Sequence, residues 1–206
     1  MDLRKEASDV ELLKRMLAGE ERAFVSLYAR HQAKVYKFAY QMSGSPALAD
    51  DVTQEVFITL MRDGANYDAK RGAVSAFLYG IARNFVLRKL AKENRFVAID
   101  EDDKSLLAIN GKPQNFNDPL QDLTRKETLD ALRQAILALP AHYREVVVLC
   151  DLHEMSYAEV ADALECAIGT VRSRLSRART LLAQRLRGAE EVNAQKKAIS
   201  AERIFI

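Results

Sequence analysis

The sequence predicts an all-α protein made of two small helical domains joined by a flexible linker, with a helix-turn-helix in the C-terminal domain. Three observations support this fold class. Apolar residues recur at helical spacing on both sides of a polar break. Only eight glycines and four prolines occur among the 206 residues, which leaves room for long uninterrupted helices. No alternating apolar run bounded by turn residues indicates a strand.

The composition fits a globular protein that would bind nucleic acid only through local patches of charge. Apolar residues make up 49% of the chain, which is enough to fill the cores of two small domains. The 31 basic and 29 acidic residues leave a net charge of only +2. Any affinity for DNA therefore has to come from uneven placement of charge along the chain.

The sequence shows no features of a secreted or membrane-spanning protein. Two cysteines are too few for a secreted disulfide scaffold, and the first residues are charged and periodic, unlike an apolar signal peptide. No run approaches the roughly 18 consecutive apolar residues of a membrane span. We therefore expect a cytoplasmic protein without membrane insertion.

Capping residues mark several helix starts. Ser8, Thr124 and Ser156 each stand three positions before a glutamate, the spacing of a capping box, and Ser45 precedes a proline at a first helical position. Caps and apolar spacing together place helices at about residues 8–18, 20–42, 46–62, 74–94, 123–138, 141–152, 156–164 and 169–187.

A break between the fourth and fifth predicted helices divides the chain. It holds the acidic cluster from Asp100 to Asp103, followed by turn-forming residues without a sustained period. We predict a first domain at residues 1–95, a linker at 96–122, a second domain at 123–188 and a tail of unassigned structure at 189–206.

The last predicted helix has one apolar side and one basic side. Its apolar stripe consists of Val171, Leu175, Ala178, Leu182 and Leu186. The opposite face carries Ser173, Ser176 and Arg177, flanked by Thr170 and Arg172, with Arg174 and Arg179 nearer the margins. Six arginines and no acid fall between Val171 and Arg187. This one-sided charge predicts phosphate neutralisation and guanine reading, the alternative being a solvated basic face.

The segment before this helix completes a helix-turn-helix. A short capped helix from Ser156 to Leu164 leads into a tight connection at 165–169 and then into the arginine helix. Ala161 is small, as a crossing of two helices requires. Glu165 stands where many such motifs have glycine, so the sequence leaves the geometry of the turn open.

The segment from Ser156 to Leu182, SYAEVADALECAIGTVRSRLSRARTLL, closely resembles region four of bacterial sigma factors of the sigma-70 family, particularly the extracytoplasmic-function (ECF) group. The preceding LRQAILALPAHYREVVVLCDLHEMS is similar to the core-building helices of the same domain. In that group the second helix of the motif reads the minus-35 promoter element. The resemblance implies a minus-35 site made of Thr170, Arg172, Ser173, Arg174, Ser176 and Arg177.

In the N-terminal half, ADDVTQEVF at residues 49–57 resembles the region-two motif by which sigma factors dock on RNA polymerase. One apolar stripe of this helix consists of Leu48, Val52, Val56 and Leu60. The other side also carries apolar residues, so the helix is either enclosed in its bundle or shared with a partner. We expect Phe57 and Met61 to be enclosed. The resemblance then implies a polymerase-binding surface made of Asp50, Asp51, Gln54 and Glu55.

The next predicted helix interleaves aromatic residues with cations. Such a mixture suits unpaired bases, which stack on rings while cations hold their backbone. The apolar members Phe77, Leu78, Ile81, Phe85 and Leu90 are also typical of a core. From Arg71 onward, RGAVSAFLYGIARNFVLRKLAKENR resembles the sigma region that melts and reads the minus-10 element. The resemblance implies that the loop at about residues 67–74 holds a flipped base, with a minus-10 site of Arg71, Arg83, Asn84 and Arg88.

The sequence offers no cofactor, metal or catalytic site. Cys150 and His153 could share a helical face, with Cys166 as a conceivable third ligand, but a zinc site also needs a fourth ligand or an open catalytic position. Structural roles are expected for both cysteines. No phosphate-binding glycine loop, nucleophile elbow or paired-carboxylate pattern is present.

These residues and the resemblance predict a dissociable promoter-specificity subunit of bacterial RNA polymerase rather than an enzyme. Its expected partners are core RNA polymerase, promoter DNA and an anti-sigma factor that wedges between the two domains. The main alternative is a helix-turn-helix regulator whose N-terminal half senses a ligand or phosphate and which binds a palindrome as a dimer. An enzyme is the third alternative, because a helical bundle with an arginine helix explains the same residues without catalysis.

Overall fold

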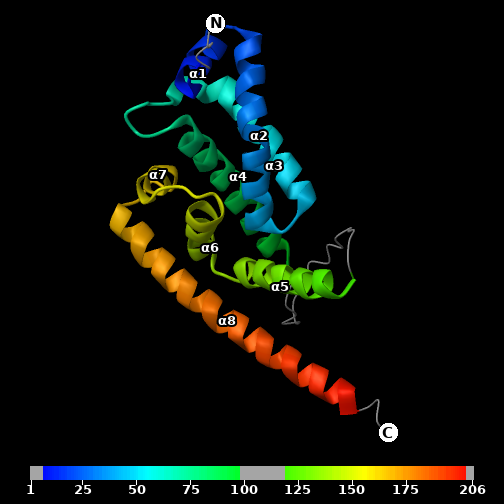
Figure 1. Ribbon diagram of the computed structural model, residues 1–206. Helices are drawn as coiled ribbons and strands as arrows, with labels where there is room; N and C mark the ends of the chain where they lie inside the picture. Colours follow the sequence, from blue (N-terminus) through cyan, green and yellow to red (C-terminus); the bar gives the residue numbers. More distant parts are fainter. Residues whose placement is uncertain (1–6, 98–118, 203–206) are drawn as a thin grey trace, which may run out of the picture.

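The computed structural model describes the backbone of residues 7–97 and 119–202, and the side chains of residues 7–92 and 128–187. Within these ranges it consists of helices and turns, without a strand. The helices form one group before residue 98 and a second group after residue 118 (Figure 1). This confirms the predicted all-α fold of two helical domains. Most of the predicted linker, residues 98–118, lies outside the described residues.

The first group is a bundle built around a long central helix. Its elements are α1 (Asp9–Leu17), α2 (Glu21–Ser43), α3 (Pro46–Asp63), the short 3-10 turn η1 (Gly64–Asn66) and α4 (Val74–Val97). The predicted caps are present, since Ser8 and Ser45 each accept a hydrogen bond from a backbone amide three residues later, at 3.2 Å. Gly44 ends α2 in the left-handed conformation that glycine adopts without strain. Phe38, Leu27 and Leu60 are among the buried side chains that α2 and α3 contribute to the core.

The second group ends in a single long helix. Its elements are α5 (Pro119–Leu137), α6 (Ala141–Val147), the π-helical turn η2 (Val148–Leu152), α7 (Tyr157–Ala163) and α8 (Ile168–Glu202). The apolar stripe of α8 is buried at Val171, Leu175, Ala178 and Leu182, which confirms its predicted phase. The interior of this domain also takes residues from α6 and η2, where Val146 to Leu149 are fully enclosed.

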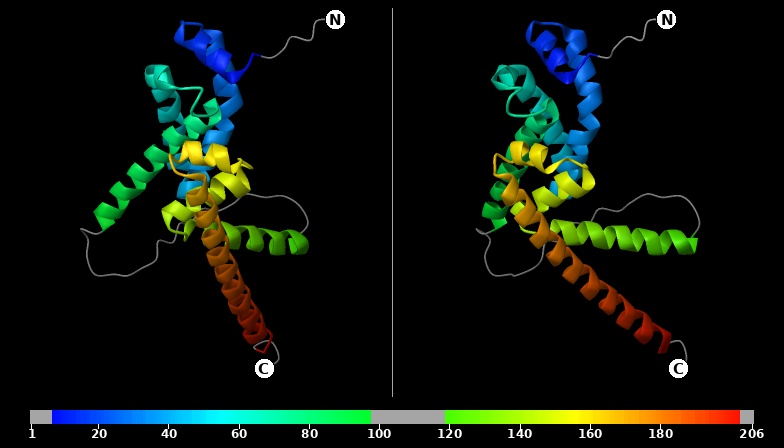
Figure 2. Two further views of the ribbon diagram at one scale, coloured as in Figure 1. Left: turned by 90° about the vertical axis from the view of Figure 1, so that its left-hand side faces the viewer. Right: turned by 60° about the vertical axis from the view of Figure 1, so that its left-hand side comes forward.

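Two predicted helix boundaries were wrong, and a third predicted helix changes its winding within its predicted span. Helix α5 begins at Pro119, inside the predicted linker, so Thr124 lies within the helix and is not its cap. The helix expected at 141–152 changes to π-helical winding at Val148. Helix α8 continues through Glu202, across most of the segment predicted as a tail (Figure 2). The polar sequence after Arg187 carries no apolar stripe, so its helical character was not visible as periodicity.

The two domains pack against each other through α4 and α7, while α2 contacts α5 and α6 (Figures 1 and 2). Gly80 of α4 lies against α7, where an added Cβ would lie 3.3 Å from the backbone carbonyl oxygen of Ala163. Ala161 and Ala163 are buried on the α7 side. Small side chains on both helices therefore allow the two domains to touch almost backbone to backbone.

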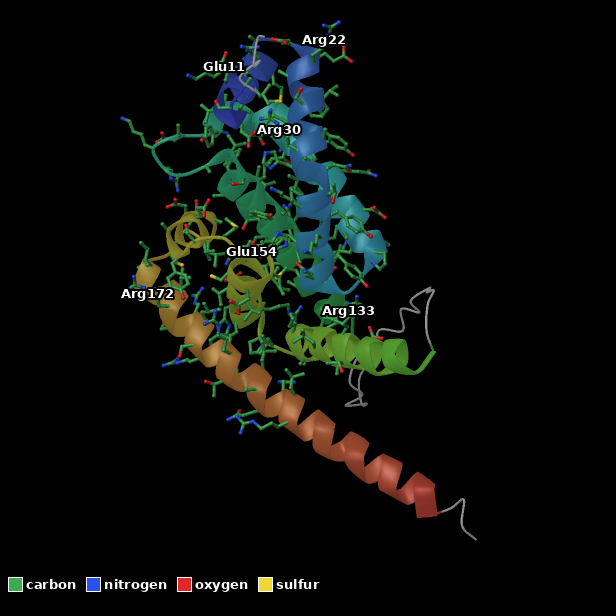
Figure 3. The ribbon with its side chains drawn as sticks, in the orientation of Figure 1. Glu11, Arg22, Arg30, Arg133, Glu154 and Arg172 are labelled. Carbon is green, nitrogen blue, oxygen red and sulfur yellow. The ribbon has the colours of Figure 1, made fainter. Side chains whose placement is uncertain are left out.

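Helix α1 is held to the bundle by one carboxylate. Asp9 accepts a hydrogen bond from the Arg30 guanidinium at 2.9 Å and lies 2.7 Å from Nε2 of the buried His31. Arg30, which faces α1 in Figure 3, also donates to the carbonyl oxygen of Ala7. Burial raises the pKa of Asp9, but the hydrogen bonds from Arg30 and His31 outweigh it and hold this pKa below its ordinary value.

We therefore expect Asp9→Asn to lower the free energy of unfolding by about 1 to 3 kcal/mol at pH 7, because charge-assisted bonds to two α2 side chains are lost. A carboxylate with a depressed folded pKa contributes stability above its unfolded pKa, and this contribution is lost as the pH falls through the folded value. The difference between variant and wild type should therefore shrink below about pH 4. Urea unfolding at pH 7, 5, 4 and 3 measures both effects.

Glu11→Gln is the matched control, since Glu11 pairs only with the exposed Arg15 one turn along the same helix. An exposed pair of this kind contributes less than about 1 kcal/mol. If Glu11→Gln destabilises the protein as much as Asp9→Asn, the cross-helix bonds of Asp9 are not what holds α1.

Candidate nucleic-acid interface

The helix-turn-helix is formed by α7 and the first half of α8. Its first helix starts at a complete capping box, in which Ser156 and Glu159 each accept a hydrogen bond from the other's backbone amide. The turn places Glu165 at a φ of 51°, the left-handed conformation for which many such motifs use glycine. The sequence left this geometry open, and the structure shows that Glu165 adopts the same backbone conformation.

The exposed face of α8 carries most of the residues predicted to read the minus-35 element. Arg172, Ser173, Ser176 and Arg177 are all exposed, opposite the buried stripe. Arg172 lies near the N-terminal end of α8, beside α7, with its guanidinium 5.9 Å from the centre of the Tyr157 ring (Figure 3). Thr170 is half-buried, and its carbonyl oxygen accepts a hydrogen bond from the Ser173 hydroxyl at 3.0 Å. These side chains form one polar, cationic surface.

Arg174 lies apart from this surface. Its side chain is half-buried and turns inward, where Nη1 lies 3.3 Å from the carboxylate of Glu145 on α6. Arg179, also near the margin, pairs with Asp151 at 2.6 Å. Of the six arginines on this helix, these two therefore hold α8 against its own domain rather than facing outward.

The loop before α4 has a defined shape. The Tyr67 hydroxyl donates to the carbonyl oxygen of Gly72 at 2.9 Å, and the Asp68 carboxylate accepts a hydrogen bond from the amide of Lys70. Gly72 has a φ of 138°, which an L-residue rarely adopts, and an added Cβ would lie 2.8 Å from the Asp162 carboxylate of α7. A side chain at this position would therefore collide with the second domain.

The predicted minus-10 residues are brought together on α4 and this loop, but two of them are already paired. Arg71 lies 3.0 Å from Glu165, and Arg83 lies 2.6 Å from Glu145. Asn84 is exposed and next to Arg83, and the exposed Arg88 places its guanidinium 4.6 Å from the centre of the Phe85 ring. The apolar residues Phe77, Ile81, Phe85 and Leu90 are partly buried against the core, while Leu78 is fully buried, as their core interpretation predicted.

A cavity of about 490 Å³ lies where this loop and α4 meet the helix-turn-helix. Tyr67, Asn84 and Gly80 line it on one side and Asp162 and Cys166 on the other. The predicted minus-10 region and the turn of the helix-turn-helix therefore border one space, although they lie about a hundred residues apart in the sequence.

The predicted polymerase-binding residues lie on the outer face of α3. Asp50, Asp51, Gln54 and Glu55 are all exposed, and Asp51 lies 3.6 Å from Lys89 of α4. Asp50 and Gln54 border a groove of about 310 Å³ between α3 and α2. The acidic face is therefore accessible in this conformation.

The same face is also apolar, which was only partly expected. Phe57 is enclosed as predicted and packs against the tilted ring of Tyr28 with 4.7 Å between ring centres. Met61 was predicted to be enclosed, but its side chain is 51% exposed, so that prediction was wrong. Ile58, at 48% exposed, lies one turn before Met61 on the same helix. Exposed apolar residues in a row along a helix face are typical of a partner-binding surface.

A buried polar network between the domains was missed by sequence reasoning. The His153 ring contacts the Tyr79 hydroxyl through Nδ1 at 2.8 Å and Oε1 of Gln41 through Nε2 at 2.9 Å. Burial raises the pKa of Tyr79 to about 12, and burial together with Lys37 and Lys34 lowers the pKa of His153 to about 4. Both groups are therefore neutral at pH 7, so Tyr79 donates to Nδ1 and the Nε2 proton is donated to Gln41.

Arg144 forms a second contact of this kind. Its guanidinium donates to the carbonyl oxygens of Leu137 and Leu139 in its own domain and of Met42 at the end of α2. Burial lowers the pKa of Arg144 from its ordinary value. The partners of Arg144, His153 and Glu145 lie between 62 and 112 positions away in the other domain, so no local pattern could have identified them.

The residues considered as metal ligands are engaged otherwise. His153 uses both ring nitrogens on Tyr79 and Gln41, and both cysteines are free and half-buried. Burial raises the pKa of Cys150 to about 11, which keeps its thiol protonated at neutral pH. Within the described residues, no three His, Cys, Asp or Glu side chains are placed to hold a metal ion. Across the same residues, no helix is long and apolar enough to cross a membrane.

Two family models match the chain. Residues 27–96 match the model described as Sigma-70 region 2, and residues 129–182 match the model described as Sigma-70, region 4. The first match ends within α4 and the second ends within the N-terminal half of α8. The gap between the two matches contains the residues that sequence analysis placed in a linker.

Several curated relatives are similar over most of their length. The chain is 29% identical over 178 residues to the ECF RNA polymerase sigma factor SigW of Bacillus subtilis, which covers 85% of this chain and 95% of the relative. It is 33% identical over 186 residues to the ECF sigma factor SigM of Mycobacterium tuberculosis, covering 89% and 87%. It is 32% identical over 186 residues to the ECF sigma-E factor of Escherichia coli, covering 85% and 92%.

Solved structures share the fold. The sigma factor RpoE of Bartonella quintana, determined in complex with the anti-sigma factor NepR, aligns with a TM-score of 0.65 and 25% identity, covering 81% of this chain and 98% of that one. CnrH, determined with the cytosolic domain of CnrY, aligns with a TM-score of 0.64 and 24% identity, covering 89% and 99%. Both alignments include residues from both helical domains.

We expect Phe57 and Met61 to respond differently to truncation, although they lie one turn apart on α3. Phe57→Ala should lower the free energy of unfolding by about 3 to 5 kcal/mol, because it empties a buried ring position. Met61→Gln should change it by less than about 0.5 kcal/mol, because the side chain is exposed. Chemical unfolding followed by circular dichroism makes the comparison. A large loss for Met61→Gln would mean that Met61 is enclosed, as the sequence first indicated.

Proposed function

The chain belongs to the ECF group of the sigma-70 family, and we propose that its two domains divide the work of promoter recognition among the surfaces described above. A sigma factor directs RNA polymerase to promoters. The observation that carries the proposal is the coexistence on one chain of three separate surfaces. They are the exposed arginine face of α8, the cations of α4 with its loop, and the acidic and apolar face of α3.

The face of α8 is the proposed minus-35 reader. Arg177 and Arg172 offer bidentate guanidinium groups, and Ser173 and Ser176 offer short hydroxyls beside them, a set suited to base edges in the major groove. Thr170 sits at the start of the same helix, where backbone amides favour phosphate. Arg174 remains in the assigned set, but its pairing with Glu145 supports a role in orienting α8.

The minus-10 element is assigned to α4 and the loop before it. Arg71, Arg83 and Arg88 supply positive charge for the backbone of a single strand, and Asn84 supplies a donor and an acceptor for a base. Tyr67 and Phe77, with ring centres 5.7 Å apart, line the neighbouring cavity with aromatic surface. Rings beside cations are suited to a base that has left its stack.

Core polymerase is assigned to the face of α3. Asp50, Asp51, Gln54 and Glu55 provide the polar contacts, and Tyr28, Ile58 and Met61 add apolar area that sequence analysis did not assign. Interfaces that combine an apolar centre with a charged rim bind more tightly than charge alone allows. The partner would then bury Met61, which explains why an apolar side chain is exposed in the free chain.

Further properties follow from this assignment. We propose that the chain is a non-enzymatic initiation factor, that it acts in the cytoplasm with polymerase, and that it divides into domains at about 1–95 and 123–188. An anti-sigma factor is a proposed partner, supported by the related RpoE, which was determined in complex with NepR. We propose that such a partner wedges between the two domains.

The decisive test is transcription with purified core polymerase of the source organism on fragmented genomic DNA, followed by sequencing of transcript ends. The chain should produce starts that share two upstream elements at fixed spacing, because the polymerase surface would set the separation of the two domains that read them. Asp51→Arg with Gln54→Ala should abolish these starts while helicity stays native. Starts that persist in this variant would remove the α3 face from the proposal. Tight binding to palindromes without polymerase would favour a conventional regulator.

A second test separates base reading from phosphate contact on α8. On a promoter identified in this way, Arg177→Ala should weaken use of the upstream element by about 1 to 3 kcal/mol and relax preference at one base position. Single-base variants of that element measure the preference. Arg185→Ala, on an exposed position two turns further along α8, is the matched control and should leave all base preferences unchanged. A uniform loss for every sequence would make Arg177 a phosphate contact.

A further inference from the structure

The contact between the domains brings negative charge of the second domain to the cations of the first. Glu145 of α6 is 1% exposed, and its carboxylate lies between Arg83 of α4, at 2.6 Å, and Arg174 of α8, at 3.3 Å. A buried carboxylate requires such partners, because an unpaired charge away from water is strongly unfavourable. Arg83 is thus the contribution of the first domain to a charge cluster that belongs otherwise to the second.

A second carboxylate repeats the arrangement at the edge of the interface. Glu165, in the turn of the helix-turn-helix, lies 3.0 Å from Arg71 in the loop before α4. Both side chains are largely exposed, so this pair contributes little stability by itself. Asp162 of α7 lies against the backbone of the same loop at Gly72. Acidic groups of the second domain therefore border the loop and α4 at three points.

The exposed cations of the second domain are arranged differently. The α8 face carrying Arg172 and Arg177 points away from the first domain and is open to solvent. The contact therefore engages Arg71 and Arg83 of one predicted DNA site, while Asn84 and Arg88 of that site and the α8 face of the other stay exposed. Two of the three arginines of the minus-10 set, Arg71 and Arg83, are paired with carboxylates of the second domain. Among the described arginines of the minus-35 set, only Arg174 pairs with one of these carboxylates, that of Glu145.

From this juxtaposition we propose that Glu145 and Glu165 occupy Arg83 and Arg71 in place of DNA phosphates, so that the free chain is closed to single-stranded DNA while its α8 face stays open. This inference rests on the proposed function of α4 and its loop. Separation of the domains releases both arginines at once, because the two carboxylates move together on one rigid domain. Single-strand binding should then strengthen when the domains part or when the two carboxylates lose their charge.

Two variants test the proposal by independent routes. Gly80→Ile places a β-branched side chain where an added Cβ already lies 3.3 Å from the Ala163 carbonyl oxygen. Because the two Cγ carbons of isoleucine cannot both point away from this oxygen, the substitution should part the domains. Glu145→Gln with Glu165→Gln removes the two negative charges and nearly preserves shape. Ala18→Ile, on an exposed position at the end of α1 far from the interface, is the matched control for the wedge. Circular dichroism checks that every variant is folded.

The measurements use the free chain. Small-angle scattering gives the radius of gyration, and fluorescence anisotropy follows binding to a labelled single-stranded 20-mer of randomised sequence, a probe whose length we set at about the site size of single-strand binders. We expect Gly80→Ile to expand the chain. Both interface variants should bind the probe about tenfold more tightly than wild type, with a salt dependence steeper by about 1.4, the value for two additional phosphate contacts. Ala18→Ile should match wild type.

The proposal is overturned if Gly80→Ile expands the chain but leaves affinity and salt dependence unchanged, or if the double glutamine variant binds like wild type. Should Gly80→Ile fail to fold, the double glutamine variant decides alone. Failure of the proposed function is distinguishable, because it appears as the absence of wild-type transcripts with core polymerase. Transcription by wild type together with unaltered single-strand binding in both variants would refute only the masking of the two arginines.

Discussion

Glu145 imposes the constraint around which both domains are arranged. A carboxylate that is 1% exposed has to be matched by donors in fixed positions, and these come from α8 through Arg174 and from α4 through Arg83. The first pairing fixes the rotation of α8 about its axis, and hence which residues face outward. The second ties the domain that carries the helix-turn-helix to the helix with the predicted minus-10 residues. The buried carboxylate of Glu145 thus couples the orientation of α8 within its domain to the placement of the two domains relative to each other.

The interface also contains polar contacts that can be exchanged with little net cost. Tyr79, His153 and Gln41 form neutral hydrogen bonds that water can replace when the domains part. When the domains part, Arg71 and Arg83 lose their contacts to the carboxylates of Glu165 and Glu145. In the proposed open state they bind DNA phosphates instead, so each guanidinium replaces one charge-assisted contact with another. Apolar contacts also cross between the domains, since one hydrophobic core cluster contains residues of both, and Phe38 of α2 packs against the His153 ring with 6.1 Å between ring centres. The interface therefore mixes exchangeable polar bonds with apolar packing, as interfaces between domains of one chain commonly do.

Local signals in the sequence predicted the helices, but they could not predict contacts between residues that lie far apart in the chain. Ser8, Ser45 and Ser156 cap helices as expected, and the stripe from Val171 to Leu182 is buried as its spacing required. The exposed positions on α8 and α3 followed from the same periodicity, although their roles remain proposals. Met61 was misplaced because helical phase shows which residues share a face, not whether a neighbour covers it. Glu145 appeared as one polar residue before an apolar run, and nothing nearby in the chain identifies Arg83 as its partner.

The length of α8 gives the second domain a mechanical property. One continuous helix runs 35 residues from the turn of the helix-turn-helix to Glu202, and its C-terminal half projects from the helical body in both views of Figure 2. At 1.5 Å per residue it is a rod of about 50 Å. Since an unbroken helix bends little, a force or a bound molecule at its far end acts as a lever on the end that would lie on DNA. Movement there turns the reading face as a unit, without any change in the side chains that form it.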